Sequence, residues 1–493
     1  MKQIILIFII SVLAISTTSD KSPNRADIIF KSHKTLSKFK KSNRIPGIAF
    51  ALFDGQDTIT THCFGESTLG SKVNQATLFN IQSISKNITA LATIKAVQND
   101  LLDLDTPISE YLPSFSVNSC FENHPENRIT LRMLLSHTAG FTHEAPVGNN
   151  YDFSPCTNED HLNSIKQTWL KFPAGADYSY SNLGFDIASE VISQKSGIKF
   201  DEYLKSEIFL PLGMISTTVN DNEVAQNKNR TDGNIQAVKT NHYKIPLPGS
   251  GAVYTNLSDF IKYTQLLMNY GVFDDKTLCS KQGLLEMFTI IRNNYGLGTY
   301  VDKKDGHFYI NHNGGGYGFS ATLLWLPEYN LGAVLLCNKP CNTFDICFSL
   351  ISDYIQDKKL EKNSSITNLF DILNGQYFSN NNDKEFFLPT CDCDSIFKPE
   401  WEKYVGKYSL LIQGLDLKWY AKLAHSFGFG NLNFWITKEG QVLKTKGSIG
   451  ASVLKGYTPG LFFTDDFEIL DLKSENMTFR NIKIVKKKQL NAL

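Results

Sequence analysis

Ser83 and Lys86 stand three residues apart at the start of a segment with helical spacing. Residues i and i+3 share one face of a helix, so the Lys86 amine can reach the Ser83 hydroxyl. A serine hydroxyl is a weak nucleophile until a neighbouring base takes its proton, and burial lowers the pKa of a lysine toward that role. The helix N-terminus adds N–H groups that favour a developing oxyanion. The pair predicts acyl transfer through a serine nucleophile.

The spacing alone does not select Ser83, because four other serines have a lysine three residues later. Taken by itself, each pair is a surface serine near a surface lysine. Ser83 differs in its context: it follows the strand-like run 78–81 and opens a long amphipathic helix, whereas the others lie on charged faces, helix ends or turns. The other pairs are Ser37/Lys40, Ser196/Lys199, Ser395/Lys398 and Ser452/Lys455.

Tyr180-Ser181-Asn182 is a second candidate element, on a loop that precedes a predicted helix. A tyrosine and an amide two residues apart can both face a cleft. The phenol can relay a proton between Ser83 and a leaving group, and the amide can hold Lys86 or a substrate carbonyl. The triplet Tyr254-Thr255-Asn256 has the same pattern, and either one alone is compatible with ordinary loop polarity.

His312-Asn313-Gly314-Gly315 is the third element, directly after the predicted strand 308–311. A histidine at a strand edge can interact with a substrate or with the tyrosine, and glycines let the backbone approach a substrate closely. The non-functional alternative is a glycine-rich turn with a surface histidine.

The three elements occur in order, with gaps of about 100 and 130 residues. In this respect the chain resembles the serine β-lactamases and penicillin-binding proteins, in the branch that has Tyr-x-Asn second and His-x-Gly in place of Lys-Thr-Gly. That branch includes class C β-lactamases, DD-peptidases, certain esterases, D-amino-acid amidases and LACTB-type proteases. The resemblance covers about residues 30–358 and includes three connecting segments, 129–141, 211–214 and 249–260.

The resemblance implies a role for each matching residue. Ser83 would be the nucleophile and Lys86 its base. Tyr180 would share the proton transfer, and Asn182 would orient the substrate and Lys86. His312 would contact the substrate in place of the family's lysine.

The resemblance further implies an oxyanion hole from the backbone N–H groups of Ser83 and Gly315, beside Gly314. A neutral histidine at 312 holds a carboxylate less strongly than a lysine, which leaves esterase, amidase and peptidase activities open. His137 is predicted to be structural. The alternative function is a catalytically idle relative that binds ligands through its cleft or its C-terminal domain.

The surrounding periodicities predict the elements that position these residues. Helical spacing marks 26–41, 84–98, 129–136, 161–169 and 182–196, and strand-like runs mark 48–53, 58–64, 308–311, 319–326 and 331–337. Strands at both ends with helices between them predict an α/β (α+β) fold. We expect an antiparallel β-sheet flanked by helices, with an all-helical subdomain and the active site between them, plus a small C-terminal all-β domain.

The predicted boundaries are a signal peptide at 1–19, the hydrolase domain at 20–358, a linker at 359–395 and the β-rich domain at 396–493. Lys2 and the apolar run 4–15, followed by small polar residues, are typical of a signal peptide. We therefore expect a secreted, extracellular or lumenal protein without a membrane span after cleavage. Export permits disulfides among the nine cysteines and glycans at five sequons.

The composition excludes several partners. Lysine plus arginine and aspartate plus glutamate both number 49, so no strongly basic face for nucleic acid is expected. No pair of Cys-x-x-Cys motifs indicates a zinc site. Acyl chemistry needs side chains and backbone alone, so no cofactor or metal is predicted. The expected partner is a small-molecule or peptide substrate, and the sequence is silent on oligomeric state.

Overall fold

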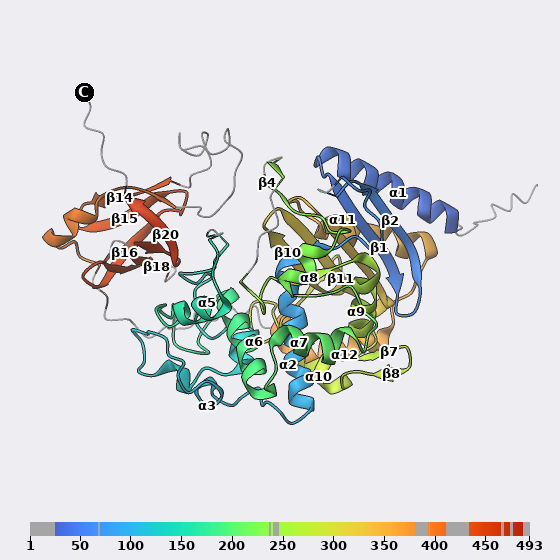
Figure 1. Cartoon of the computed structure of the whole chain (residues 1–493), viewed down its shortest axis with the longest axis horizontal. Helices are drawn as coiled ribbons and strands as arrows, with labels where there is room; N and C mark the ends of the chain where they lie inside the picture. Colours follow the sequence, from blue (N-terminus) through green and yellow to red (C-terminus); the bar gives the residue numbers. More distant parts are fainter. Residues whose placement is uncertain are drawn as a thin grey trace, which may run out of the picture.

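The computed structural model describes most of the chain, in a larger domain and a smaller β-barrel (Figure 1). The described residues are 25–67, 70–150, 152, 154–235, 238–239, 246–379, 393, 395–410, 433–464, 468–473 and 477–486.

A six-stranded antiparallel sheet forms the centre of the larger domain, with strand order β2-β1-β12-β11-β10-β9. The inner strands are continuous apolar runs because helices cover both faces. Their bounds are β1 Gly47–Asp54, β2 Thr58–Gly65, β9 Tyr300–Lys304, β10 His307–Gly316, β11 Phe319–Leu326 and β12 Leu331–Cys337.

Two helices cover one face of the sheet, and a third packs against the opposite face. Helix α1 (Arg25–Ser42) and helix α11 (Phe344–Lys358) pack on the first face through a core that includes Phe50 and Leu335. Helix α9 (Leu257–Met268) packs on β1 and β12 from the other side, and α2 (Ser85–Gln98) lies deeper in the same core. The sheet therefore sits between helical layers (Figure 1).

Short helices and hairpins between β2 and β9 form the predicted helical part of the domain. The fold class predicted from the sequence is thus confirmed. The remaining elements of this region are α3 Ile108–Tyr111, α4 Leu131–Leu135, α5 Asn158–Ile165, α6 Asn182–Ser196, α7 Phe200–Leu204, α8 Asp221–Gln226, α10 Lys281–Phe288, and the paired strands β3 Phe79–Asn80 with β6 Tyr254–Thr255, β4 Asn234–Ile235 with β5 Val238–Lys239, and β7 Val272–Phe273 with β8 Lys276–Thr277.

The segment predicted as a linker contains a helix, α12 (Ser364–Ser379), so the linker prediction is wrong for these residues. The side chain of Phe370 is fully buried in the core of the larger domain. Asn374 accepts a hydrogen bond from the backbone N–H of Ile290 at 2.7 Å and donates one to the carbonyl of Phe288 at 3.3 Å. The larger domain therefore continues past residue 358.

The C-terminal residues form a closed antiparallel barrel, as the strand-like runs predict for an all-β domain. Its core includes Trp401, Phe434, Leu454 and Phe462. The strands are β13 Gly406–Leu410, β14 Asn433–Glu439, β15 Val442–Gly447, β16 Ser452–Thr458, β17 Leu461–Phe463, β18 Ile469–Asp471, β19 Thr478–Phe479 and β20 Ile482–Lys486, in that order around the barrel.

Some predictions fall outside these elements. The predicted signal peptide, 1–19, lies outside the described residues. None of the helices in the described ranges is long and apolar enough to cross a bilayer. The structure shows free thiols, outside the disulfides that export would permit, at these described cysteines: Cys63, Cys120, Cys279, Cys337, Cys341 and Cys347.

Candidate active site

Ser83 lies in a 3₁₀ turn, Gln82–Ile84, that leads directly into α2. The turn follows β3, and the Asn80 side chain fixes it from both sides. Its Oδ1 accepts a hydrogen bond from the backbone N–H of Gln82 at 2.7 Å, and its Nδ2 donates to the carbonyl of Gly251 at 3.2 Å. Gln82 is left-handed, with φ 51°. Such backbone strain clusters at functional positions, and here it presents Ser83 at the start of a helix.

Lys86 is fully buried one turn after Ser83, as the i and i+3 spacing predicts. Its Nζ lies 3.2 Å from Ser83 Oγ, 2.7 Å from Asn182 Oδ1 and 3.0 Å from the carbonyl oxygen of Ser250. Burial lowers the pKa of Lys86 to about 7, against the opposing charges of Asp186 and Glu144. An amine with this pKa is partly neutral at physiological pH and can accept the proton of Ser83.

Tyr180 and Asn182 approach the same hydroxyl and amine from the N-terminus of α6. Ser181 caps this helix by accepting a hydrogen bond from the backbone N–H of Leu183 at 3.1 Å. Burial raises the pKa of the Tyr180 hydroxyl, and its interaction with Ser83 opposes this rise. Its ring centroid lies 4.9 Å from Lys86 Nζ. The structure thus brings together four residues that the sequence separates into two motifs.

A buried carboxylate that the sequence analysis did not single out, Glu144, orients Asn182. Glu144 is 1% exposed. Its Oε1 accepts hydrogen bonds from Asn182 Nδ2 at 3.3 Å and from Asn150 Nδ2 at 2.5 Å, and it lies 2.8 Å from His143 Nδ1. Since the Nδ2 group faces Glu144, the Oδ1 of Asn182 must face Lys86. His143 and Asn150 hold the pKa of Glu144 below its usual value despite burial.

A second buried carboxylate, Asp186, fixes the Ser250 carbonyl that binds Lys86. Asp186 accepts hydrogen bonds from the backbone N–H and the hydroxyl of Ser250, both at 3.0 Å. His161 Nε2 lies 3.2 Å from the same carboxylate, and His161 Nδ1 lies 2.7 Å from the carbonyl of Val147. Asp186 is therefore paired on both sides, as a buried charge requires.

Gly314 and Gly315 lie at the end of β10, next to the segment that carries Ser83. Strand β9 pairs with β10 only as far as Asn311, so in the described structure the later part of β10 has an open edge on that side. A Cβ at Gly314 would lie 2.0 Å from the carbonyl oxygen of Ile81, which explains why only glycine fits there, whereas a Cβ at Gly315 would meet nothing within 4 Å. Backbone N–H groups on such an edge suit a developing oxyanion.

His312 lies beside this edge but is buried, with 1% exposure. Its Nδ1 lies 2.8 Å from the carbonyl oxygen of Asn313 and therefore donates to it, so Nε2 accepts a hydrogen bond from the Tyr295 hydroxyl at 2.9 Å. Burial and the nearby Lys86 lower the pKa of His312 to about 3. Both ring nitrogens are occupied, so the neutral ring has no free donor for a substrate. Tyr295 is a neighbour that sequence reasoning missed.

His137 has the packing position that the sequence suggested. Its Nδ1 accepts a hydrogen bond from the backbone N–H of Ser181 at 3.0 Å, and its ring centroid lies 4.2 Å from that of Tyr180 and 4.7 Å from that of Tyr295. Burial lowers its pKa well below the usual value. A neutral His137 thus supports the backbone next to Tyr180.

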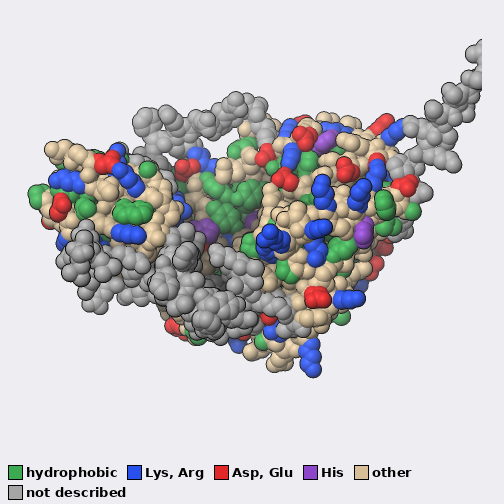
Figure 2. Space-filling model, turned by 90° about the horizontal axis from the view of Figure 1, so that it is seen from above, with side chains coloured by type: hydrophobic (Ala, Val, Ile, Leu, Met, Phe, Trp, Pro, Cys, Tyr) green, Lys and Arg blue, Asp and Glu red, His purple; other side chains and the backbone are tan. Residues whose placement is uncertain are grey.

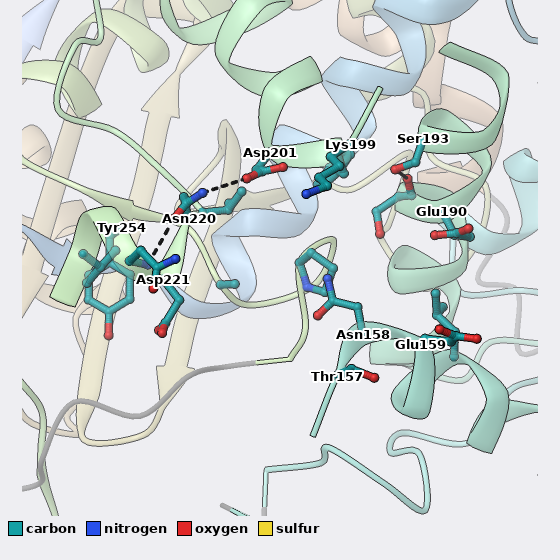
Figure 3. Close-up of a pocket in the computed structure, with 18 residues that line it drawn as sticks. Thr157, Asn158, Glu159, Glu190, Ser193, Lys199, Asp201, Asn220, Asp221 and Tyr254 are labelled. Atoms are coloured by element: carbon teal, nitrogen blue, oxygen red, sulfur yellow. Dashed lines mark hydrogen bonds between the residues drawn. The ribbon is translucent and has the colours of Figure 1, made fainter. Parts of the chain in front are cut away.

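The second Tyr-x-Asn triplet lies outside this constellation. Asn256 caps α9 by accepting a hydrogen bond from the backbone N–H of Asp259 at 2.8 Å. Tyr254 lines a separate cavity of about 800 Å³ between the ends of α5, α6 and α8, where Asn220 donates to Asp201 at 3.0 Å (Figure 3). None of the predicted catalytic residues lines this cavity, so the second triplet, 254–256, is structural.

Comparison with known proteins agrees with this geometry. The chain matches the Beta-lactamase family over residues 33–346. It is 26% identical over 373 residues to the unguisins hydrolase of Aspergillus campestris, covering 70% of this chain and 68% of that protein. It is 25% identical over 330 residues to the D-alanyl-D-alanine-carboxypeptidase/endopeptidase AmpH of Escherichia coli, covering 63% and 84%.

Solved structures share the fold. The octameric penicillin-binding protein homologue from Pyrococcus abyssi aligns with a TM-score of 0.59 at 18% identity, covering 93% of this chain and 96% of that one. A class C beta-lactamase mutant aligns with a TM-score of 0.56 at 17% identity, covering 68% of this chain and 99% of that one. The first alignment is long enough to include much of the C-terminal barrel.

Proposed function

The chain belongs to the Beta-lactamase family, and we propose that it is a serine hydrolase that forms an acyl-enzyme on Ser83 and hydrolyses an ester or amide bond. One observation carries this proposal: the Nζ of Lys86 lies 3.2 Å from Ser83 Oγ, and its pKa is lowered to about 7. A serine beside a partly neutral amine is an activated nucleophile.

In the first half of the reaction, Ser83 Oγ bonds to the carbonyl carbon of the substrate while its proton passes to Lys86 Nζ. The carbonyl electron pair moves onto oxygen, where the backbone N–H groups of Ser83 and Gly315 would stabilise the negative charge. When this intermediate collapses, the bond to the leaving group breaks. The Tyr180 hydroxyl, which interacts with Ser83, would relay the proton to the leaving oxygen or nitrogen.

In the second half, water attacks the acyl carbon, its proton passes to the same base, and Ser83 is released with its proton restored. Asn182 would orient Lys86 and the substrate through these steps. The reaction needs no further reagent, because an ester or amide and water together yield a carboxylic acid and an alcohol or amine.

The environment of His312 bears on the substrate class. Because both of its ring nitrogens are engaged, this residue cannot hold a substrate carboxylate as the lysine of Lys-Thr-Gly would. We infer that the substrate is an ester or amide, peptides included, that does not depend on a carboxylate at this position.

A covalent probe tests the proposal. A fluorophosphonate loses fluoride when a serine oxygen attacks its phosphorus, so labelling reports an activated serine without knowledge of the substrate. We expect wild type and Ser37→Ala to label and Ser83→Ala to remain unlabelled, since Ser37 also precedes a lysine by three residues but lies on α1. Equal labelling of Ser83→Ala would show that the nucleophile is another residue.

Folded wild type that takes no label would instead support the idle binding protein. If labelling succeeds, nitrocefin, p-nitrophenyl esters, D-amino-acid amides and peptides would then distinguish β-lactamase-like, esterase, amidase and peptidase activity.

A further inference from the structure

The turn between β19 and β20 projects from the barrel toward the larger domain. It contains two residues, Arg480 and Asn481, since Phe479 pairs with Ile482. Both are left-handed, with φ 51° and 64°, which is the geometry that a two-residue type I′ hairpin requires. The side chain of Asn481 is 5% exposed, although the tips of hairpins ordinarily face water.

The Asn481 amide is buried because it binds the larger domain. Its Nδ2 donates to Thr142 Oγ1 at 2.7 Å and to the carbonyl oxygen of Glu144 at 2.8 Å. Both partners lie on one loop, and Asn481 follows each of them by more than 330 positions in the sequence. One barrel side chain thus uses both of its donors on one short segment.

That segment, residues 142–144, is also bound to the loop that carries Tyr180. The carbonyl of Thr142 accepts a hydrogen bond from the Ser181 hydroxyl at 2.6 Å, and the carbonyl of His143 accepts one from the backbone N–H of Asn182 at 3.1 Å. Three successive carbonyls therefore have fixed partners. The catalytic loop holds the first two, and the third accepts the 2.8 Å bond from the barrel together with a longer one, 3.3 Å, from Thr142 Oγ1.

Glu144 connects this segment to the reacting groups. Its carboxylate accepts from Asn182 Nδ2 at 3.3 Å, and Asn182 Oδ1 accepts from Lys86 Nζ at 2.7 Å. A continuous hydrogen-bonded path thus leads from Asn481 in the barrel to the amine next to Ser83. The side chains at its centre are buried, where unsatisfied polar groups are costly and displacements propagate.

Other contacts hold the barrel in this orientation. Lys171 Nζ lies 2.7 Å from Glu468 Oε1, and both side chains are nearly buried. The rings of Trp169 and Tyr457 meet edge to face, with centroids 5.4 Å apart. On the face in Figure 2, a hollow in which hydrophobic and histidine side chains are visible lies between the barrel and the larger domain. The barrel is therefore docked by charge and aromatic contacts beside the 142–144 segment.

We propose that Asn481 is a positioning residue for the catalytic amine, and that the C-terminal barrel thereby completes the active site of the same chain. This inference rests on the proposed function. Asn481 fixes the carbonyl of Glu144 from outside, so that the carboxylate of Glu144 stays aimed at Asn182. Without the barrel contact, the carbonyl of Glu144 keeps only the 3.3 Å hydrogen bond from Thr142 Oγ1. The Glu144 carboxylate, which Asn150 also binds, is then held less firmly against the Asn182 amide that orients Lys86.

The test compares Asn481→Gly with wild type by the rate and the final extent of fluorophosphonate labelling, well below the unfolding transition. Glycine keeps the left-handed turn at no steric cost and removes the two donors. We expect labelling to reach the same final stoichiometry with a rate constant about tenfold lower, the size of effect expected for two lost hydrogen bonds. A merely structural role would lower the labelled fraction and leave the rate constant of the folded molecules unchanged.

Asn330→Gly is the matched control, because Asn330 is also left-handed, with φ 50°. It lies beyond Leu326, at the opposite end of β11 from the pair Gly316 and Phe319, and we expect it to label at the wild-type rate.

The inference is overturned if Asn481→Gly labels within twofold of the wild-type rate, if it loses stoichiometry but not rate, or if Asn330→Gly slows labelling as much. Wild type that takes no label would overturn the proposed function, and the inference with it. That outcome is distinct from one in which wild type and Asn481→Gly label equally fast.

Discussion

The pH dependence of labelling tests Lys86 as the base of Ser83. Only the neutral amine accepts a proton, so the rate constant should follow the neutral fraction of Lys86. With a pKa of about 7, that fraction is about 1% at pH 5, about half at pH 7 and about 99% at pH 9. We therefore expect the second-order rate constant for fluorophosphonate labelling to rise about a hundredfold from pH 5 to a plateau near pH 9.

Two variants assign this rise to Lys86. In Lys86→Arg the guanidinium stays protonated throughout the range, so labelling should fall about a thousandfold and lose its pH dependence. Glu144→Gln removes one of the two charges, with that of Asp186, that raise the pKa of Lys86, so the midpoint of the rise should move to lower pH. His312 does not contribute, because burial and Lys86 lower its pKa to about 3 and it is already neutral at pH 5.

The reasoning is refuted by a wild-type profile that is flat between pH 5 and 9, or by a midpoint near the usual lysine pKa. A Lys86→Arg variant that keeps the wild-type slope would assign the titration to another group. A Glu144→Gln midpoint that moves to higher pH would show that the sign of the electrostatic coupling is wrong.

Three further changes follow from the geometry. Gly314→Ala should slow labelling at least about a hundredfold, because its Cβ would lie 2.0 Å from a backbone oxygen in the segment before Ser83. The Cβ of Gly315→Ala meets open space, so this variant should lose less than about tenfold in labelling rate. Equal losses in the two variants would contradict the steric argument. Tyr180→Phe should reduce turnover of an amide about a hundredfold but of a p-nitrophenyl ester much less, since p-nitrophenolate leaves without a proton; equal losses in kcat would exclude the relay. Asp186→Asn should destabilise the fold by about 3–5 kcal/mol, because its buried histidine partner loses its counter-charge; urea unfolding at pH 7 would detect this, and an unchanged midpoint would show that the pair is not ionised.

Local geometry explains which parts of the site could be predicted from the sequence. Ser83 and Lys86 are one helical turn apart, and Tyr180 and Asn182 share one loop. The proximity within each pair therefore follows from short-range spacing in the sequence. Their joint position depends on the fold, and for that the prediction relied on motif order. Glu144 had no such signal, because a carboxylate in a loop is ordinarily solvated and only the tertiary structure buries it.

His312 shows the limit of a motif. The sequence places a histidine where a lysine would contact substrate, which suggests a substrate ligand. The structure engages one ring nitrogen with Asn313 and the other with Tyr295. Tyr295 lies in a short bridged segment before β9, without a periodic pattern that would have brought the two residues together.

The linker prediction failed for a similar reason. The polar run Asn363-Ser364-Ser365 has the composition of a connector, but the Asn363 side chain accepts hydrogen bonds from the backbone N–H groups of Ser365 at 3.1 Å and Ile366 at 3.3 Å. Asparagine and serine favour both loops and helix N-termini. Deciding between them required Phe370, whose burial against the larger domain stabilises the helix.

Asn481 combines these limits and shows why the two domains must be considered together. As a sequence feature it is an asparagine in a turn, and a glycine would form the same left-handed turn with less strain. What a glycine lacks is the amide, and the amide is the part that binds Thr142 and Glu144. The choice of asparagine is therefore explained by the neighbouring domain rather than by the hairpin, and a barrel isolated from the larger domain would contain this residue without its partners.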